Sequence, residues 1–141
     1  MKSYYDYLKE SIQELQDKGE DVDKAVLYLP DFFGLLCALL DKDEVDKNSR
    51  MLINSALAYF VSPSDVVPEE VYGAYGYLDD LYLTCVVLKN LDSKYKDLIR
   101  KSWEGSAPYD EAIDYAIFKA EKFLDEKNLK DKVLSYAGLG E

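Results

Sequence analysis

Two apolar stretches decide the fold of this chain. Residues 51–61 read MLINSALAYFV, and residues 77–88 read YLDDLYLTCVVL. Each stretch is apolar on almost every face of a helix, and helices of that kind lie in the interior of a bundle. We therefore expect two central helices, over about 45–61 and 77–91, that pack against each other.

Helical periodicity continues on both sides of this pair. Apolar residues recur at helical spacing near the N-terminus, where Gly19 provides a stop, and again after Pro108 and Asp110. The two stripes are Tyr4, Tyr5, Leu8, Ile12 and Leu15, and Ile113, Ala116, Ile117, Ala120, Phe123 and Leu124. Strand signals are weak, because long alternating runs and Asn-Gly or Asp-Gly turns are missing. The sequence thus predicts an all-α fold, a single domain over 1–141 built as a compact bundle of five to seven helices.

The remaining segments are predicted less directly. Residues 21–40 favour two helices, with Asp31 after Pro30 as the N-cap of a helix over 32–40. A short helix is expected over 93–104, with Trp103 as a packing anchor. Residues 138–141 are expected to fray.

Composition excludes several classes of function. The 141 residues include 28 acids against 17 Lys and Arg, for a net charge of −11, and contain no histidine. Nucleic-acid binding and docking on anionic lipid both need a basic surface. Without histidine, Ser-His-Asp and Cys-His catalysis and His-ligated zinc or haem are also excluded.

The cysteines and the N-terminus indicate the cellular setting. Cys37 and Cys85 each lie in an apolar run, which predicts two reduced core cysteines rather than a disulfide framework. Residues 1–7 contain an acid and no apolar signal-peptide core, and no apolar run approaches the length of a membrane span. We therefore expect a cytoplasmic protein without a membrane span.

The segment between the two central helices carries the most information. Residues 62–80 read SPSDVVPEEVYGAYGYLDD, and residues 62–88 contain five acids and no Lys or Arg. Pro63 ends the preceding helix, and Pro68 followed by Glu69 and Glu70 suits one short helical turn. Gly76 allows a positive φ before the next helix begins.

This segment resembles a known family. The run ALAYFVSPSDVVP, followed after about eight residues by GYLDD, is similar to the YkvA-like family of helical domains of unknown function, over residues 52–88. The matching motif residues are Ser62, Pro63, Asp65, Pro68, Gly76, Tyr77, Asp79 and Asp80, with Glu69 where the family usually has Asp. The resemblance implies a small helical module without an established enzymatic activity, and it supplies no catalytic residues.

The acids of the motif allow two interpretations. Asp65, Asp79 and Asp80 could converge on a divalent cation such as Mg²⁺ or Ca²⁺, which prefer oxygen ligands. Alternatively, Asp65 accepts hydrogen bonds from nearby backbone N–H groups, while Asp79 and Asp80 cap the following helix. Adjacent helical residues point about 100° apart, so Asp65 with one of the pair is the more plausible ligand set.

The tyrosines of the same segment also allow two interpretations. Tyr72, Tyr75, Tyr77 and Tyr82 could form a recognition patch, or they could lie at the edge of the core with buried rings and wet hydroxyls. Catalytic motifs such as a Walker loop or Gly-x-Ser-x-Gly are missing from the sequence. The sequence therefore favours a non-enzymatic interaction or adaptor module that binds another protein through segment 62–80. The alternative is a metal-binding protein or metal-dependent enzyme.

Overall fold

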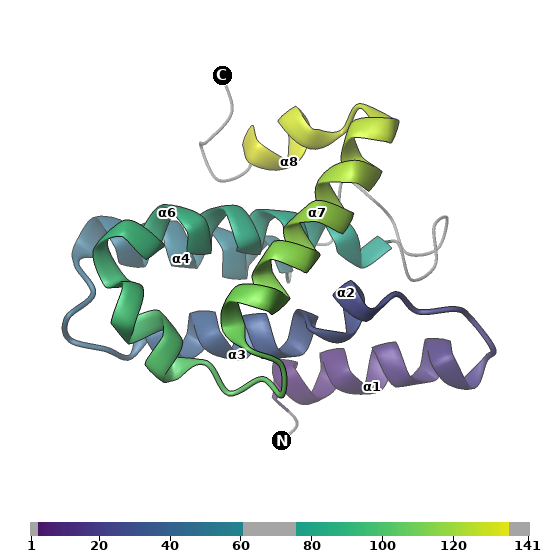
Figure 1. Ribbon diagram of the computed structural model, residues 1–141, viewed down its shortest axis with the longest axis horizontal. Coiled ribbons are helices and arrows are strands. Elements are labelled where there is room, and N and C mark those ends of the chain that lie inside the picture. Colours follow the sequence, from purple (N-terminus) through teal and green to yellow (C-terminus); the bar gives the residue numbers. More distant parts are fainter. Residues whose placement is uncertain (1–2, 61–75, 136–141) are drawn as a thin grey trace.

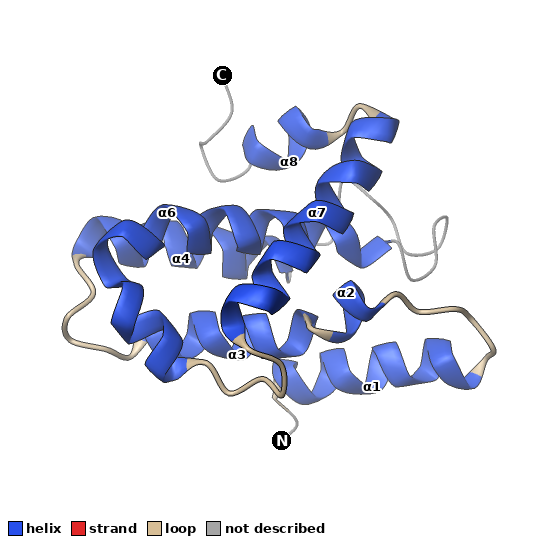
Figure 2. Ribbon diagram, viewed as in Figure 1, coloured by secondary structure: helices blue, strands red, loops and turns tan. Residues whose placement is uncertain are grey.

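The computed structural model describes residues 3–60 and 76–135. These residues form helices and no strands, which confirms the all-α prediction (Figures 1 and 2). The helices are α1 (Tyr4–Asp17), α2 (Lys24–Leu27), α3 (Leu29–Leu40), α4 (Lys47–Phe60), α6 (Leu78–Ser102), α7 (Tyr109–Lys127) and α8 (Lys130–Ser135).

Helix α6 lies at the centre of the bundle. It packs against α3, α4, α7 and α8, and α7 crosses it on the near face in Figure 1. Helix α4 packs against α6 and α3, so the two helices predicted to be central do lie side by side. Most of α6 before residue 92 is buried, whereas α4 leaves Met51 on the surface with 59% of its area exposed.

The second half of α6 was expected to be a separate short helix. In the structure two helical stretches of α6 meet in a kink at Tyr95, the one residue inside it with non-helical backbone angles, and the second stretch runs to Ser102, so the predicted short helix is present and begins after the kink. Residues 91–93 contain neither Gly nor Pro, so nothing in the sequence stops the helix there. The Tyr95 hydroxyl accepts a hydrogen bond from the Asp46 backbone N–H at 2.8 Å, and Lys94 pairs with the Asp46 carboxylate. These contacts hold the bend against the start of α4.

The predicted division of residues 21–40 into two helices is confirmed, but the cap is different. Asp23 is the N-cap of α2, where its side chain accepts a hydrogen bond from the Ala25 N–H. Pro30 lies in the first turn of α3, so Asp31 is inside that turn and not the cap. The prediction of Asp31 as N-cap was wrong because proline is tolerated at the first helical positions, where its missing N–H costs nothing.

The outer helices follow their predicted stripes. Helix α1 ends at Asp17, and Lys18 is its C-cap. Gly19 follows with a left-handed φ of 86°, as expected of a helix stop. Helix α7 begins after Pro108 and buries Ile113, Ala116, Ala120 and Leu124. Trp103 packs on Phe32 and Tyr109, and its Nε1 donates to the Ala107 carbonyl at 2.8 Å. The prediction of Trp103 as a packing anchor is thereby confirmed.

The prediction of two core cysteines was half wrong. Cys85 is fully buried in α6, whereas Cys37 is exposed on α3. Helix α3 buries Phe32, Leu35, Leu36 and Leu39, so its opposite face carries Gly34, Cys37, Ala38 and Asp41 at helical spacing. On that face Cys37 and Asp41 are exposed, whereas Gly34 lies close to the Tyr5 ring of α1.

The two thiols are therefore expected to differ in reactivity. With a thiol reagent at pH 8, the folded protein should react once, at Cys37, and a second time only after unfolding in denaturant. Burial raises the pKa of the Cys85 thiol, which keeps it protonated as well as inaccessible. The variant Cys37→Ser should show no reaction while folded, and equal rates for both thiols in the native protein would contradict this burial.

Arg50 secures the connection between α3 and α4. Its guanidinium donates to the carbonyls of Leu40 and Lys42, both at 2.6 Å, and to that of Val45 at 2.9 Å. The Leu40 carbonyl lies in the last turn of α3, where a helix leaves carbonyls without an intrahelical partner, whereas those of Lys42 and Val45 belong to the connection that follows. One planar side chain thus satisfies three backbone acceptors across the turn.

Replacing Arg50 by methionine is expected to lower the free energy of unfolding by about 1–2 kcal/mol, discounted for partial exposure. Arg50→Lys should recover only a fraction of that loss, because an ammonium group does not span three carbonyls in this fork. Urea unfolding of the three proteins measures both effects. If the lysine variant were as stable as the wild type, charge alone and not the fork geometry would explain the role of Arg50.

Within the described residues, no helix combines the length and the apolar character that a membrane span needs.

Candidate functional site

The candidate site lies where α4 ends and α6 begins. Gly76 and Tyr77 form a short 3₁₀ turn that leads into α6, and both are buried. Asp79 and Asp80 follow in the first turn of α6, where the helix dipole favours acids. The N-cap position is held by Tyr77 without a side-chain hydrogen bond, so the two aspartates lie inside the helix and not at its cap.

Both aspartates are buried to an unusual degree. Asp79 is 0% exposed and Asp80 is 3% exposed. Carboxylates are rarely buried in this way unless they are hydrogen-bonded, paired with a cation or bound to a metal. Their burial therefore needs specific partners in the surrounding structure.

Tyr59 is one such partner. From the last turn of α4, its hydroxyl donates a hydrogen bond of 2.6 Å to Oδ2 of Asp79, and both residues are buried. That distance is typical of a strong O–H···O⁻ bond. The bond joins the end of α4 to the start of α6, so the two helices that flank residues 61–75 are fastened together at those ends.

A second tyrosine supports the same end of α4. The Tyr4 hydroxyl, from α1, donates at 2.7 Å to the carbonyl of Phe60, the last residue of α4. This bond satisfies one of the carbonyls that a helix C-terminus leaves without an intrahelical partner. The Tyr4 ring also packs on Phe33 and Phe60, so helices α1, α3 and α4 meet beneath the site.

The structure places only part of the predicted site. Gly76, Tyr77, Asp79 and Asp80 come together as described, whereas Ser62, Pro63, Asp65, Pro68 and Glu69 lie outside the described residues. Convergence of Asp65 with Asp79 and Asp80 therefore stays a prediction. Among the residues that are described, no three Asp, Glu, Cys or His side chains are grouped so that they could hold a metal ion.

The tyrosines of the motif divide in the same way. Tyr77 and Tyr82 are 7% and 4% exposed, which agrees with a place at the core edge rather than in a recognition patch. Burial raises the pKa of the Tyr82 phenol. Tyr72 and Tyr75 lie outside the described part of the chain.

Tyr59 is the residue of the site that sequence reasoning missed. It was assigned to an apolar run, although a buried tyrosine hydroxyl usually needs a hydrogen-bond partner. That requirement was the available signal. Nothing in the sequence indicated that the partner would be Asp79, which lies twenty residues farther along the chain.

Comparison with known proteins identifies relatives of two kinds. An uncharacterized protein, ORF9, of Methanothermobacter thermautotrophicus is 33% identical over 125 residues, which cover 88% of this chain and 84% of that protein. The E3 ubiquitin-protein ligases RNF170 of Xenopus laevis and Xenopus tropicalis are 39% identical over 44 residues, which cover 31% of this chain but only 17% of theirs. No solved structure matches the chain.

The family pattern falls on the site itself. Residues 49–85 match the family described as a protein of unknown function, DUF1232, and this range includes most of α4, the motif and the first turns of α6. The match agrees with the resemblance to YkvA-like domains that the motif over 52–88 indicated. Together with the relationship to ORF9 along most of both chains, it shows that this chain belongs to the DUF1232 family.

Proposed function

We propose that this chain is a protein-interaction module that binds its partner through the acidic, tyrosine-rich segment 62–80. The observation that carries the proposal is the hydrogen bond between Tyr59 and Asp79, which fastens together the two helices at the base of the segment. Binding residues are often found on connecting segments that a rigid scaffold holds in position. The buried Tyr59 and Asp79 belong to that scaffold. Asp65, Glu69 and Glu70 supply the negative charge of the segment.

Two further observations support a module of this kind. Apart from the buried Asp79 and Asp80, the segment contributes Asp65, Glu69 and Glu70, and residues 62–88 contain no Lys or Arg, which would favour a partner with a basic surface. In addition, a stretch of 44 residues of this chain is similar to part of a much longer protein, RNF170, whereas ORF9 is of similar length to this chain. A sequence unit that occurs in both settings behaves as a module.

The test compares partner capture by the wild type and by a variant that loses three segment acids, Asp65→Asn, Glu69→Gln and Glu70→Gln. Asp79 and Tyr77 are left unchanged because they are buried, and changing them would disturb the fold. After cross-linking in cell extract, bound proteins are quantified by mass spectrometry. We expect the specific partner to be captured about tenfold less well by the variant, which corresponds to about 1.4 kcal/mol.

The matched control removes three exposed acids elsewhere, Asp43→Asn, Glu44→Gln and Glu104→Gln. It changes the net charge by the same amount and should retain the partner. Thermal melts verify that both variants fold. If every protein captured by the wild type were captured equally by the segment variant, the segment would not be the binding surface.

The burial of Asp79 and Asp80 also favours a second candidate, a divalent-cation site completed by Asp65. Oxygen ligands of this kind suit Mg²⁺ or Ca²⁺. The test is a thermal melt of EDTA-treated protein with and without each ion. An ion at 100 times its dissociation constant adds about 2.7 kcal/mol, which raises the Tm by several degrees. A shift that Asp65→Asn abolishes would support a metal site, and no shift with either ion would contradict it.

A further inference from the structure

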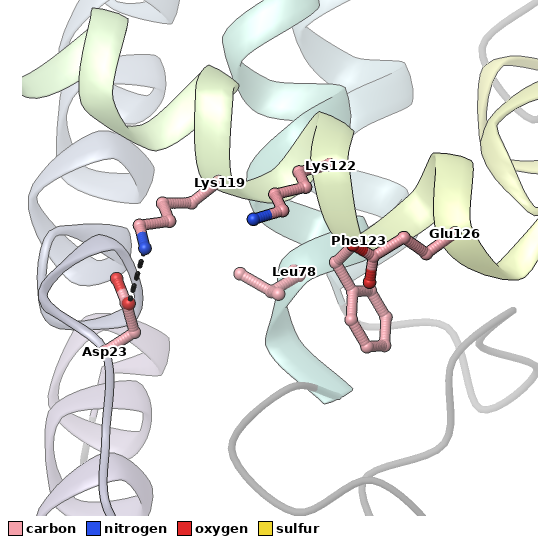
Figure 3. A pocket seen from close by; sticks show the side chains of 6 residues that line it. All are labelled: Asp23, Leu78, Lys119, Lys122, Phe123 and Glu126. Carbon is pink, nitrogen blue, oxygen red and sulfur yellow. Dashed lines mark ion pairs between the residues drawn. The ribbon is translucent and has the colours of Figure 1, made fainter.

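A cavity of about 210 Å³ lies between α2, the start of α6 and α7, and of its lining residues only Leu78 belongs to the segment that the proposed function uses (Figure 3). Its described lining comes from the N-cap of α2, the first residue of α6 and one side of α7: Asp23, Leu78, Lys119, Lys122, Phe123 and Glu126. Two apolar side chains thus lie beside four charged ones. The cavity is smaller than the sites of drug-sized ligands, so it suits a single side chain or a short organic molecule.

Two of the charged residues compensate each other. The Asp23 carboxylate accepts hydrogen bonds from the Ala25 N–H at 2.8 Å and from the Tyr115 hydroxyl at 3.1 Å. It also forms an ion pair with Lys119 at 3.7 Å, drawn as the dashed line in Figure 3. Asp23 and Lys119 therefore close one end of the cavity and leave no net charge there.

Lys122 differs from Lys119. Within the described part of the chain its ammonium group forms no ion pair and no hydrogen bond, although the chain carries a net charge of −11. In Figure 3 the Lys122 side chain points toward the part of the cavity where Leu78 and Lys119 lie, while Glu126 lies next to Phe123. Lys122 is exposed, so its ammonium group is available to an anion that enters the cavity.

We propose that this cavity binds a carboxylate that is attached to a short apolar group. The carboxylate would pair with the Lys122 ammonium, and the apolar group would pack mainly on the half-buried Phe123, beside the small part of Leu78 that is exposed. A phosphate dianion fits less well, because Asp23 and Glu126 also face the cavity and, of the described lining, only Lys122 is a cation without an ion pair. The N-terminus of α6 adds little attraction, since Asp79 and Asp80 already occupy its first turn.

Two kinds of ligand carry a carboxylate next to a short apolar group: a free short-chain carboxylic acid and the C-terminus of another protein. Both present one anionic group next to a few apolar carbons. The proposal does not depend on the acids of segment 62–80, so it can fail or succeed separately from the proposed function.

The experiment is an NMR titration of the full ¹⁵N-labelled chain with four probes. Hexanoate is compared with hexanamide, and a tripeptide with a C-terminal leucine carboxylate is compared with its C-terminal amide. We expect saturable shifts for amides of α7 and the start of α6 with the carboxylate probes, and about tenfold weaker binding of the neutral amides. Whether hexanoate or the peptide binds more tightly distinguishes the two sources.

Two variants make the test specific to the cavity. Lys122→Met keeps the aliphatic stem and removes the charge, and it should weaken carboxylate binding by about tenfold. Lys101→Met removes the same charge from an exposed position outside the cavity and should bind like the wild type. Equal binding of hexanoate and hexanamide, unchanged binding by Lys122→Met, or the lack of a saturable shift with every probe would each overturn the proposal.

Discussion

Replacing Phe32 by alanine is expected to lower the free energy of unfolding by about 3–5 kcal/mol, because the lost ring leaves a cavity in the core. Phe32 is 0% exposed and lies at the point where α3 meets the end of α6. Its ring centroid is 4.9 Å from that of Trp103 and 6.4 Å from that of Tyr28. Neither neighbouring ring can fill the space without giving up its own contacts.

The matched control is Phe118→Ala on α7, where 63% of the side chain is exposed. This variant removes the same atoms from the surface and should change the stability by less than about 0.5 kcal/mol. At 141 residues, the loss expected for Phe32→Ala lowers the Tm by roughly 10–17 °C. Thermal and urea melts measure both variants, and a similar small effect at the two positions would mean that Phe32 is not a core residue.

The parts of the fold that could be predicted are those with a one-sided pattern. Helix α7 shows apolar residues at helical spacing with acids near its start, so its first residues and its buried face follow from the sequence. Its end does not, because the chain breaks at the left-handed Asn128 before Lys130 and Lys132, which lie in the separate helix α8. Helix α1 shows the same signals with Gly19 as its stop. In these helices the local pattern and the tertiary structure agree.

The parts of the fold that could not be predicted are those where the sequence pattern does not determine which helix face is buried or where a helix ends. Residues 32–40 are apolar all round, and which side faces the core depends on helices α1, α4 and α6, so Cys37 was placed on the wrong side. The break between the first and second stretches of α6 was predicted a few residues too early, because a kink at Tyr95 without Gly or Pro leaves no sequence signal. In both cases the decision comes from packing between elements that are far apart in the sequence.

The candidate site follows the same division. Its location was predictable, because the motif residues Gly76, Tyr77, Asp79 and Asp80 stand out by type and spacing. The hydrogen bonds within the site could not be predicted. Tyr59 donates to Asp79 from another helix, and Tyr4 donates to the Phe60 carbonyl from α1, 56 residues earlier in the chain. A motif indicates which residues matter, whereas the partners that keep its buried carboxylates stable are visible only in three dimensions.

Replacing Tyr59 by phenylalanine is expected to lower the free energy of unfolding by about 1.5–3 kcal/mol, because a buried carboxylate loses one hydrogen-bond donor while the ring still fills its space. The corresponding drop in Tm is roughly 5–10 °C for a chain of this length. Tyr7→Phe is the matched control, since Tyr7 is 52% exposed and should lose less than about 0.5 kcal/mol. Equal stability of the two variants would show that the Tyr59–Asp79 bond contributes nothing to the fold.

The same variant also tests how stability and binding are linked at this site. Asp79→Asn keeps an oxygen that can accept the Tyr59 hydrogen bond but removes the charge, so combining it with Tyr59→Phe in a double-mutant cycle isolates the energy of the charged bond.

If the bond positions segment 62–80, Tyr59→Phe should weaken partner capture while the segment acids are all intact. If Tyr59→Phe is less stable yet captures the partner as well as the wild type does, then the Tyr59–Asp79 bond stabilises only the helical bundle. In that case the bond is not needed for the acids of segment 62–80 to bind the partner.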